Sequence, residues 1–210
     1  MKIKNLVLGL ASAICFAVPA FATPFTVSNI SFTHEGGYAV NGANNDGLLG
    51  MEFLTTGFTA KDFDLTTVGQ FFEFKFGTAE LTEANAGIDA NETDLLKVFA
   101  NFTFAAPNAF SRTVTASATP VVGPINDDAV DLTLAWTPEI VNFGTTGKFQ
   151  ISLNDLVFSQ RGMQTATARI TLLATDTAVV PPGGTVPEPG SLALGALGLA
   201  AVGMARRRKR

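Results

Sequence analysis

Apolar and polar residues alternate with a period of two in five separate segments between residues 23 and 177, and no sustained helical period appears among them. Successive side chains of a strand point to opposite faces of a sheet, so this alternation is typical of strands that bury one face. The segments are residues 70–81, 95–104, 128–136, 148–158 and 165–174. The alternation therefore predicts a body made of β-strands.

The apolar faces of these strands are built largely from phenylalanine. The chain has 18 Phe residues but one Trp and one Tyr, and Phe favours pleated, half-buried positions. In residues 70–81, for example, Phe72, Phe74 and Phe76 fall on one face. We expect the burial of such faces to be the main force that drives folding.

Segments rich in Gly, Asn, Asp and Pro separate the strands. They occur at residues 44–47, 86–89, 123–128 and 143–147, and such residues supply the backbone conformations of tight turns. Many short strands with spaced turns predict an all-β fold, an antiparallel β-sandwich that is jelly-roll-like, with residues 23–178 as one domain. Residues 79–85 are compatible with one short helix.

The first 22 residues have the three parts of a secretory signal peptide. Lys2 and Lys4 supply the positive charge, residues 6–18 form an apolar helix, and Ala20 and Ala22 form a small-x-small cleavage site. Cleavage there makes Thr23 the first residue of the exported chain. The single Cys of the sequence lies within this peptide, so the exported chain can form no disulfide and no thiol site.

The C-terminus has a second three-part segment. A Pro- and Gly-rich linker covers residues 179–186, and residues 192–205 are uncharged and apolar. This apolar helix is shorter than the roughly 18 residues of a comfortable membrane span. A basic stop follows, which the positive-inside rule holds in the cytoplasm. It consists of Arg206, Arg207, Arg208, Lys209 and Arg210.

Between the linker and the apolar helix stand Pro187, Glu188 and Pro189. Both prolines disfavour helix, so the motif is expected to stay extended, as a protease substrate does. With the helix and the basic stop, it resembles the PEP-CTERM sorting domain of Gram-negative bacteria, over residues 187–210. An ordinary tail anchor that stays in the membrane is the alternative.

That resemblance implies a route out of the cell. The chain would use the Sec machinery, stay briefly in the inner membrane, and be cut by exosortase near Pro187–Glu188–Pro189. It would then reach the cell surface or the extracellular matrix of a bacterium that typically makes exopolysaccharide. The order of the strands is also similar to that of the choice-of-anchor extracellular domains that often precede such tails.

The body between the two terminal segments is acidic. The chain has 14 Lys and Arg and 18 Asp and Glu. Seven of the basic residues lie in the terminal segments, whose one acidic residue is Glu188, so residues 23–186 have 7 basic and 17 acidic residues, a net charge of −10. Such a body repels phosphates and argues against a nucleic-acid partner. It is suited to binding cations.

One acidic segment has oxygen ligands at spaced positions. Asp89, Asn91 and Asp94 could hold Ca²⁺, which prefers several oxygen ligands from a loop. The segment is not an EF-hand, because Asp94 stands where Gly is needed and Ala100 where Glu is needed. A solvated polar turn is the alternative, and no other cofactor is expected.

Two weaker patterns bear on catalysis. His34 is the one histidine of the chain, near an expected strand end, and nothing local resembles a nucleophile elbow. Asp62 and Asp64 would share one face of a strand, as a glycosidase pair does. We expect His34 to be a surface residue and the protein not to be an enzyme.

Taken together, these features predict an exported surface or matrix protein with a structural or adhesive role in a biofilm or exopolysaccharide matrix. One alternative is a lectin-like module that binds carbohydrate or Ca²⁺. A second is a hydrolase of matrix polysaccharide that uses Asp62 and Asp64.

Overall fold

The computed structural model of the protein describes residues 22–40 and 46–176. In this part of the chain the secondary structure is strand and turn, without an α-helix. The all-β prediction is therefore confirmed for the body. The two predicted terminal helices, at residues 6–18 and 192–205, lie outside the described residues.

The described strands form two six-stranded sheets and one two-stranded sheet. The first sheet has the order β13-β10-β8-β7-β1-β4, the second has the order β11-β12-β14-β5-β3-β2, and β6 pairs with β9. The strands are β1 (Thr23–His34), β2 (Tyr38–Ala39), β3 (Leu49–Leu54), β4 (Lys61–Leu65), β5 (Phe71–Leu81), β6 (Gly87–Ile88), β7 (Lys97–Ala106), β8 (Phe110–Pro120), β9 (Gly123–Pro124), β10 (Leu132–Thr137), β11 (Glu139–Phe143), β12 (Gly147–Leu153), β13 (Leu156–Phe158) and β14 (Gly162–Ala174).

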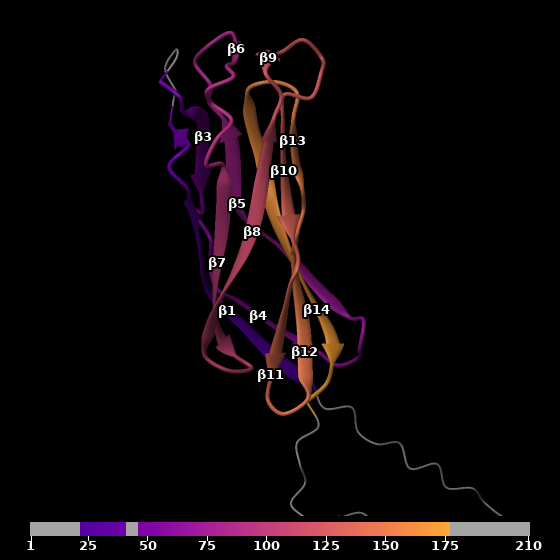
Figure 1. Ribbon diagram of the computed structural model, residues 1–210. Coiled ribbons are helices and arrows are strands. Elements are labelled where there is room, and N and C mark those ends of the chain that lie inside the picture. Colours follow the sequence, from indigo (N-terminus) through magenta and orange to yellow (C-terminus); the bar gives the residue numbers. More distant parts are fainter. Residues whose placement is uncertain (1–21, 41–45, 177–210) are drawn as a thin grey trace, which may run out of the picture. The chain divides into compact units, whose positions relative to one another are not determined.

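The pairing between these strands is antiparallel, with one exception. β2 and β3 run parallel, with Tyr38 opposite Leu49. Most neighbours in the sheets are distant in sequence: β1 pairs with β7, and β5 pairs with β14. Figure 1 shows β6 and β9 at one end of this body and the β11–β12 turn at the other.

One apolar core joins the two large sheets. The ring of Phe149 on β12 lies 5.2 Å from the ring of Phe25 on β1 and 5.2 Å from that of Phe104 on β7. Further along, Phe76 on β5 lies 5.7 Å from Phe102 on β7. These contacts cross from one sheet to the other, as the alternation of Phe residues requires. Two sheets that share a core are compatible with the predicted sandwich.

Three of the predicted strands are confirmed with their faces. On β5, Phe74 and Phe76 are buried and Phe72 is half-buried. On β7 and β14 every second residue is buried along the predicted face. The buried residues of these two strands are Val98, Ala100, Phe102, Phe104, Ala166, Ala168, Ile170 and Leu172.

The expectations for two other segments and for the helix need correction. The segment 128–136 becomes a strand only from Leu132, because the backbone turns before it: Asn126 and Asp128 have positive φ angles of 71° and 67°. Val130 is consequently 45% exposed rather than buried. The segment 148–158 divides into β12 and β13, which belong to different sheets.

The short helix with which residues 79–85 are compatible does not form. Its first three residues complete β5, where Ala79 and Leu81 point into the core with the strand period of two. The following residues have no regular structure, and the carboxylate of Glu83 accepts hydrogen bonds from the backbone N–H groups of Gly50 and Asn85. Burial on the sheet therefore overrides the helical propensity of the segment.

Candidate functional site

The two ends of the body mark where the predicted processing segments join it. β1 begins at Thr23, the predicted first residue after cleavage, and Ala22 before it is exposed. Ala20 lies outside the described residues. At the other end, β14 finishes at Ala174, and Asp176 is the last residue that the structure describes.

Asp176 ties this end of the chain to the β11–β12 turn. Its Oδ1 atom accepts hydrogen bonds from the backbone N–H groups of Thr145, at 2.8 Å, and Thr146, at 3.1 Å. These bonds favour the ionised carboxylate, so the pKa of Asp176 is lowered. Gly144 has a positive φ of 54° and leaves no room for a side chain beside this carboxylate. The chain is thus held in place just before the linker.

The residues of the predicted sorting signal lie outside the described residues. They are Pro187, Glu188, Pro189, Arg206, Arg207, Arg208, Lys209 and Arg210. The described part of the chain has no helix that is long and apolar enough to cross a membrane.

The β6–β9 end collects the buried polar side chains of the described body, namely Glu83, Asn85, Glu92 and Asp131. Arg161 donates hydrogen bonds to the backbone carbonyls of Glu83 and Asn85. A buried polar group is costly unless it is hydrogen-bonded, so this end depends on the contacts of a few side chains.

Glu92 is the most deeply buried of these acids, with a side chain 0% exposed. Its Oε2 atom accepts a hydrogen bond from the backbone N–H of Asp89 at 2.8 Å, whereas its Oε1 atom has no partner among the described residues. Burial raises the pKa of Glu92, and the nearby negative charges of Glu83, Asp89 and Asp46 raise it further. The burial of Glu92 was not predicted from the sequence, although Glu three residues after Asp is a spacing that favours such a backbone cap.

The predicted calcium ligands are all in the loop between β6 and β7. Asp89 is half-buried, while Asn91 and Asp94 are exposed. Among the residues that the structure describes, no three His, Cys, Asp or Glu side chains gather closely enough to hold a metal ion. Calcium binding by this loop therefore stays a prediction.

The residues considered for catalysis lie on two strands, His34 on β1 and the acidic pair on β4. His34 is exposed at the end of β1, with its Nδ1 atom 2.7 Å from the carbonyl oxygen of Glu35. Asp62 and Asp64 are exposed on β4, which is the edge strand of the first sheet. The Oδ1 atom of Asp62 accepts a hydrogen bond from the Thr26 hydroxyl at 2.7 Å. The pair therefore shares one face of a strand, as predicted.

Two hollows lie on the second sheet, on either side of the β5–β14 pair: the larger where the end of β3 and the loop after it meet β5, and the smaller between β12 and β14. One, of about 400 Å³, is lined by residues that include Phe58, Lys75, Met163 and Thr165. The other, of about 210 Å³, is lined by residues that include Glu73, Ser152, Thr167 and Arg169. We call these two hollows together the β5–β14 groove.

Comparison with known proteins identifies the tail. The family model described as the PEP-CTERM protein-sorting motif matches residues 185–209, which include Pro187, Glu188, Pro189 and most of the basic stop. No curated protein and no solved structure matches the chain. The chain therefore carries a PEP-CTERM protein-sorting motif, which marks it as an exported protein of a Gram-negative bacterium that exosortase processes and that is delivered to the cell surface.

Proposed function

We propose that the protein is a structural or adhesive component of the cell surface or extracellular matrix, as in a biofilm or an exopolysaccharide matrix. The observation that supports this role is the sorting motif at residues 185–209. The all-β body is what the tail would deliver. We also infer that its two large sheets form a sandwich of jelly-roll type.

In this proposal the tail is a sorting signal that is removed once it has been recognised. Exosortase cuts near Pro187–Glu188–Pro189, which separates the body from the apolar segment and from the basic stop. Asp176 already fixes the end of the body at the β11–β12 turn. The linker 179–186 then gives the enzyme access to the motif without unfolding β14.

The test is cell fractionation of chains with altered tails. Deletion of residues 186–210, or the double substitution Pro187→Ala and Pro189→Ala, should remove the protein from the cell surface. The matched control is Pro181→Ala with Pro182→Ala, which alters two prolines of the linker and should leave delivery unchanged. A chain without residues 186–210 that still reaches the surface in normal amount would refute the proposed role of the tail.

A second candidate function is a carbohydrate-binding module, and the β5–β14 groove is the observation that favours it. The groove has a carboxylate, a guanidinium and hydroxyl groups that can hydrogen-bond sugar hydroxyls, and the exposed ring of Phe71 lies beside it. The two functions are compatible, because an adhesive protein of a matrix needs a matrix ligand.

A further inference from the structure

The two hollows of the β5–β14 groove each take lining residues from both β5 and β14. On β5, Lys75 lines the larger hollow and Glu73, two residues earlier on the same face, lines the smaller one. On β14, Thr165 lines the larger hollow and Arg169 the smaller one. Four residues of strand span about 13 Å. The groove is therefore longer than a single sugar ring and suits a chain.

The charge of the groove is opposite to that of the body. The described residues contain 17 acidic and 7 basic side chains, whereas the charged residues that line the groove are two basic ones, Lys75 and Arg169, and one acidic one, Glu73. Glu52 and Glu80 lie opposite each other further along the sheet and line neither hollow. An anionic ligand would therefore be repelled by most of the body but not by this groove.

The smaller hollow is organised around a fixed guanidinium group. The Nε and Nη2 atoms of Arg169 donate to Oε2 of Glu73 at 3.0 and 2.8 Å. The guanidinium carbon also lies 4.3 Å from the centre of the Phe71 ring, which is 51% exposed. Nη1 of Arg169 and Oε1 of Glu73 take no part in this pair, so one donor and one acceptor remain beside an aromatic surface.

These groups match the chemistry of an acidic sugar. A carboxylate accepts hydrogen bonds from guanidinium and ammonium groups, which are stronger than those between neutral partners. A sugar hydroxyl can donate to Oε1 of Glu73 and bond the hydroxyl of Ser152, and the C–H face of the ring can pack on Phe71. In the larger hollow, Phe58 and Met163 offer further apolar contact beside the ammonium group of Lys75.

We propose that the β5–β14 groove binds a polysaccharide chain of uronic acids, with Arg169 and Lys75 each binding a carboxylate of the chain. The proposal deepens the proposed function, on which it rests, by assigning a ligand class and a site to the surface protein.

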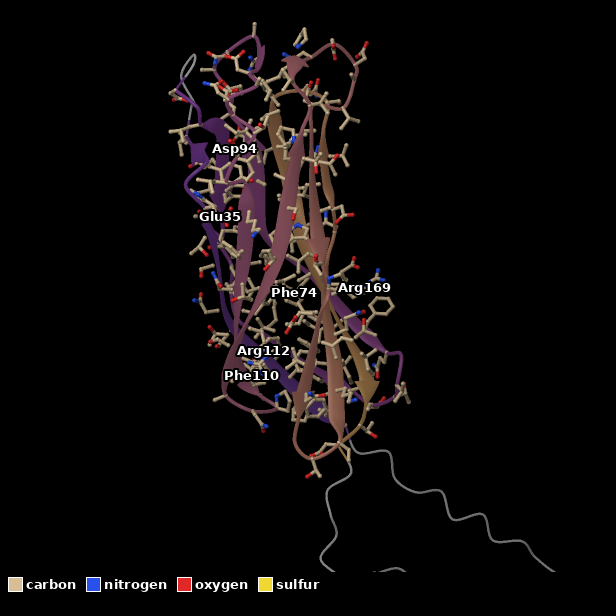
Figure 2. The ribbon with its side chains drawn as sticks, in the orientation of Figure 1. Glu35, Phe74, Asp94, Phe110, Arg112 and Arg169 are labelled. Atoms are coloured by element: carbon tan, nitrogen blue, oxygen red, sulfur yellow. The ribbon has the colours of Figure 1, made fainter. Side chains whose placement is uncertain are left out.

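The structure provides a matched control on the other sheet. Arg112 of β8 lies over the ring of Phe110 at 5.1 Å, as Arg169 lies over Phe71, but it lines neither hollow. Figure 2 labels both arginines, which extend from strands of different sheets. Arg112→Met therefore removes one positive charge and one arginine–phenylalanine contact, as Arg169→Met does.

The experiment is affinity electrophoresis of the protein, purified from the bacterium that makes it, in gels containing alginate as a polyuronate or dextran as a neutral polymer. We expect alginate to retard the protein, dextran to leave it unaffected, and added NaCl to weaken the retardation. Arg169→Met and Lys75→Met should each raise the apparent Kd for alginate about tenfold, the loss of one charged hydrogen bond. Arg169→Lys should have a smaller effect, and Arg112→Met none.

Several results would overturn the proposal: no retardation by alginate at low salt, equal retardation by dextran, or an equal loss of binding in Arg112→Met and Arg169→Met. Circular dichroism and the Tm of each variant establish that it is folded. We expect folded variants because the side chains of Lys75, Arg112 and Arg169 are exposed. The outcome is separate from that of the tail experiment. A protein that is delivered to the surface but does not bind alginate refutes only the groove, and one that binds but is not delivered refutes only the sorting role.

Discussion

Phe149 offers the most direct test of the shared core. It lies on β12 of the second sheet with its side chain 0% exposed, and its ring contacts Phe25 and Phe104 of the first sheet at 5.2 Å each. Replacing a buried Phe by Ala costs about 3–5 kcal/mol from lost transfer free energy and the cavity left behind. Aromatic pairs, each of about 0.5–1.5 kcal/mol, are part of this cost, so a ring in two such pairs falls in the upper part of the range. We therefore expect Phe149→Ala to lower the free energy of unfolding by about 4–5 kcal/mol.

The assay is urea denaturation followed by far-UV circular dichroism. Phe71→Ala is the matched control, since Phe71 belongs to the same sheet but has half of its surface in water and one contact with Arg169. Its expected cost is about 1 kcal/mol or less. A cost of under about 1 kcal/mol for Phe149→Ala, or equal costs for the two variants, would refute a core shared by the two sheets.

Three other substitutions test particular contacts. Tyr38→Phe removes the 2.7 Å hydrogen bond from the buried Tyr38 hydroxyl to the Leu96 carbonyl, so urea denaturation should show a loss of about 1–3 kcal/mol, and an unchanged midpoint would contradict that bond. The lowered pKa of Asp176 means that its ionised form contributes stability above its unfolded pKa of about 3.9, and that this contribution is lost as pH falls through the folded value. The Tm difference between the wild type and Asp176→Asn should therefore disappear in acid; a difference that persists unchanged at pH 2 would argue against the cap. For Glu92 the sign is opposite: burial raises its pKa, so its contribution is present below the unfolded value of about 4.3 and is lost as pH rises through the folded value. Between pH 4 and 8 the wild type should lose more stability than Glu92→Gln in urea titrations, and parallel curves would show that the carboxyl is not buried in this way.

The parts of the fold that could be predicted are those in which large apolar residues alternate with polar ones. β5 has Phe72, Phe74 and Phe76 on one face and β7 has Phe102 and Phe104 on one face, so the faces of both strands can be assigned from the sequence alone. β8 could not be recognised in the same way, because its buried positions include the small residue Ala116 among many Ser and Thr. Small residues give a weak periodic pattern even when they are fully buried.

The break between β12 and β13 depends on contacts that are not local. Asn154 follows β12, and its Oδ1 atom accepts a hydrogen bond from the backbone N–H of Thr167 at 2.6 Å. Asp155 beside it accepts one from the backbone N–H of Trp136 at 2.9 Å. These partners lie on other strands, so the continuous alternation of residues 148–158 gave no indication of the break.

The sorting motif and the β5–β14 groove also differ in whether they can be recognised from the sequence. A sorting motif is a linear sequence that an enzyme reads, so Pro187, Glu188 and Pro189 could be recognised without a structure. The β5–β14 groove requires the pairing of strands, since Glu73 and Arg169 are 96 residues apart. The burial of Glu92 likewise follows from packing at the β6–β9 end, which residue spacing alone does not reveal.

The most direct test of cleavage at both ends of the chain is the intact mass of the protein recovered from the cell surface or the culture medium. We predict a chain that begins at Thr23 and ends near Pro187–Glu188–Pro189. Any mass beyond that of this chain would belong to a group attached after cleavage. A recovered chain that still contains Arg206–Arg210 would contradict the account, because the tail would then be a lasting membrane anchor.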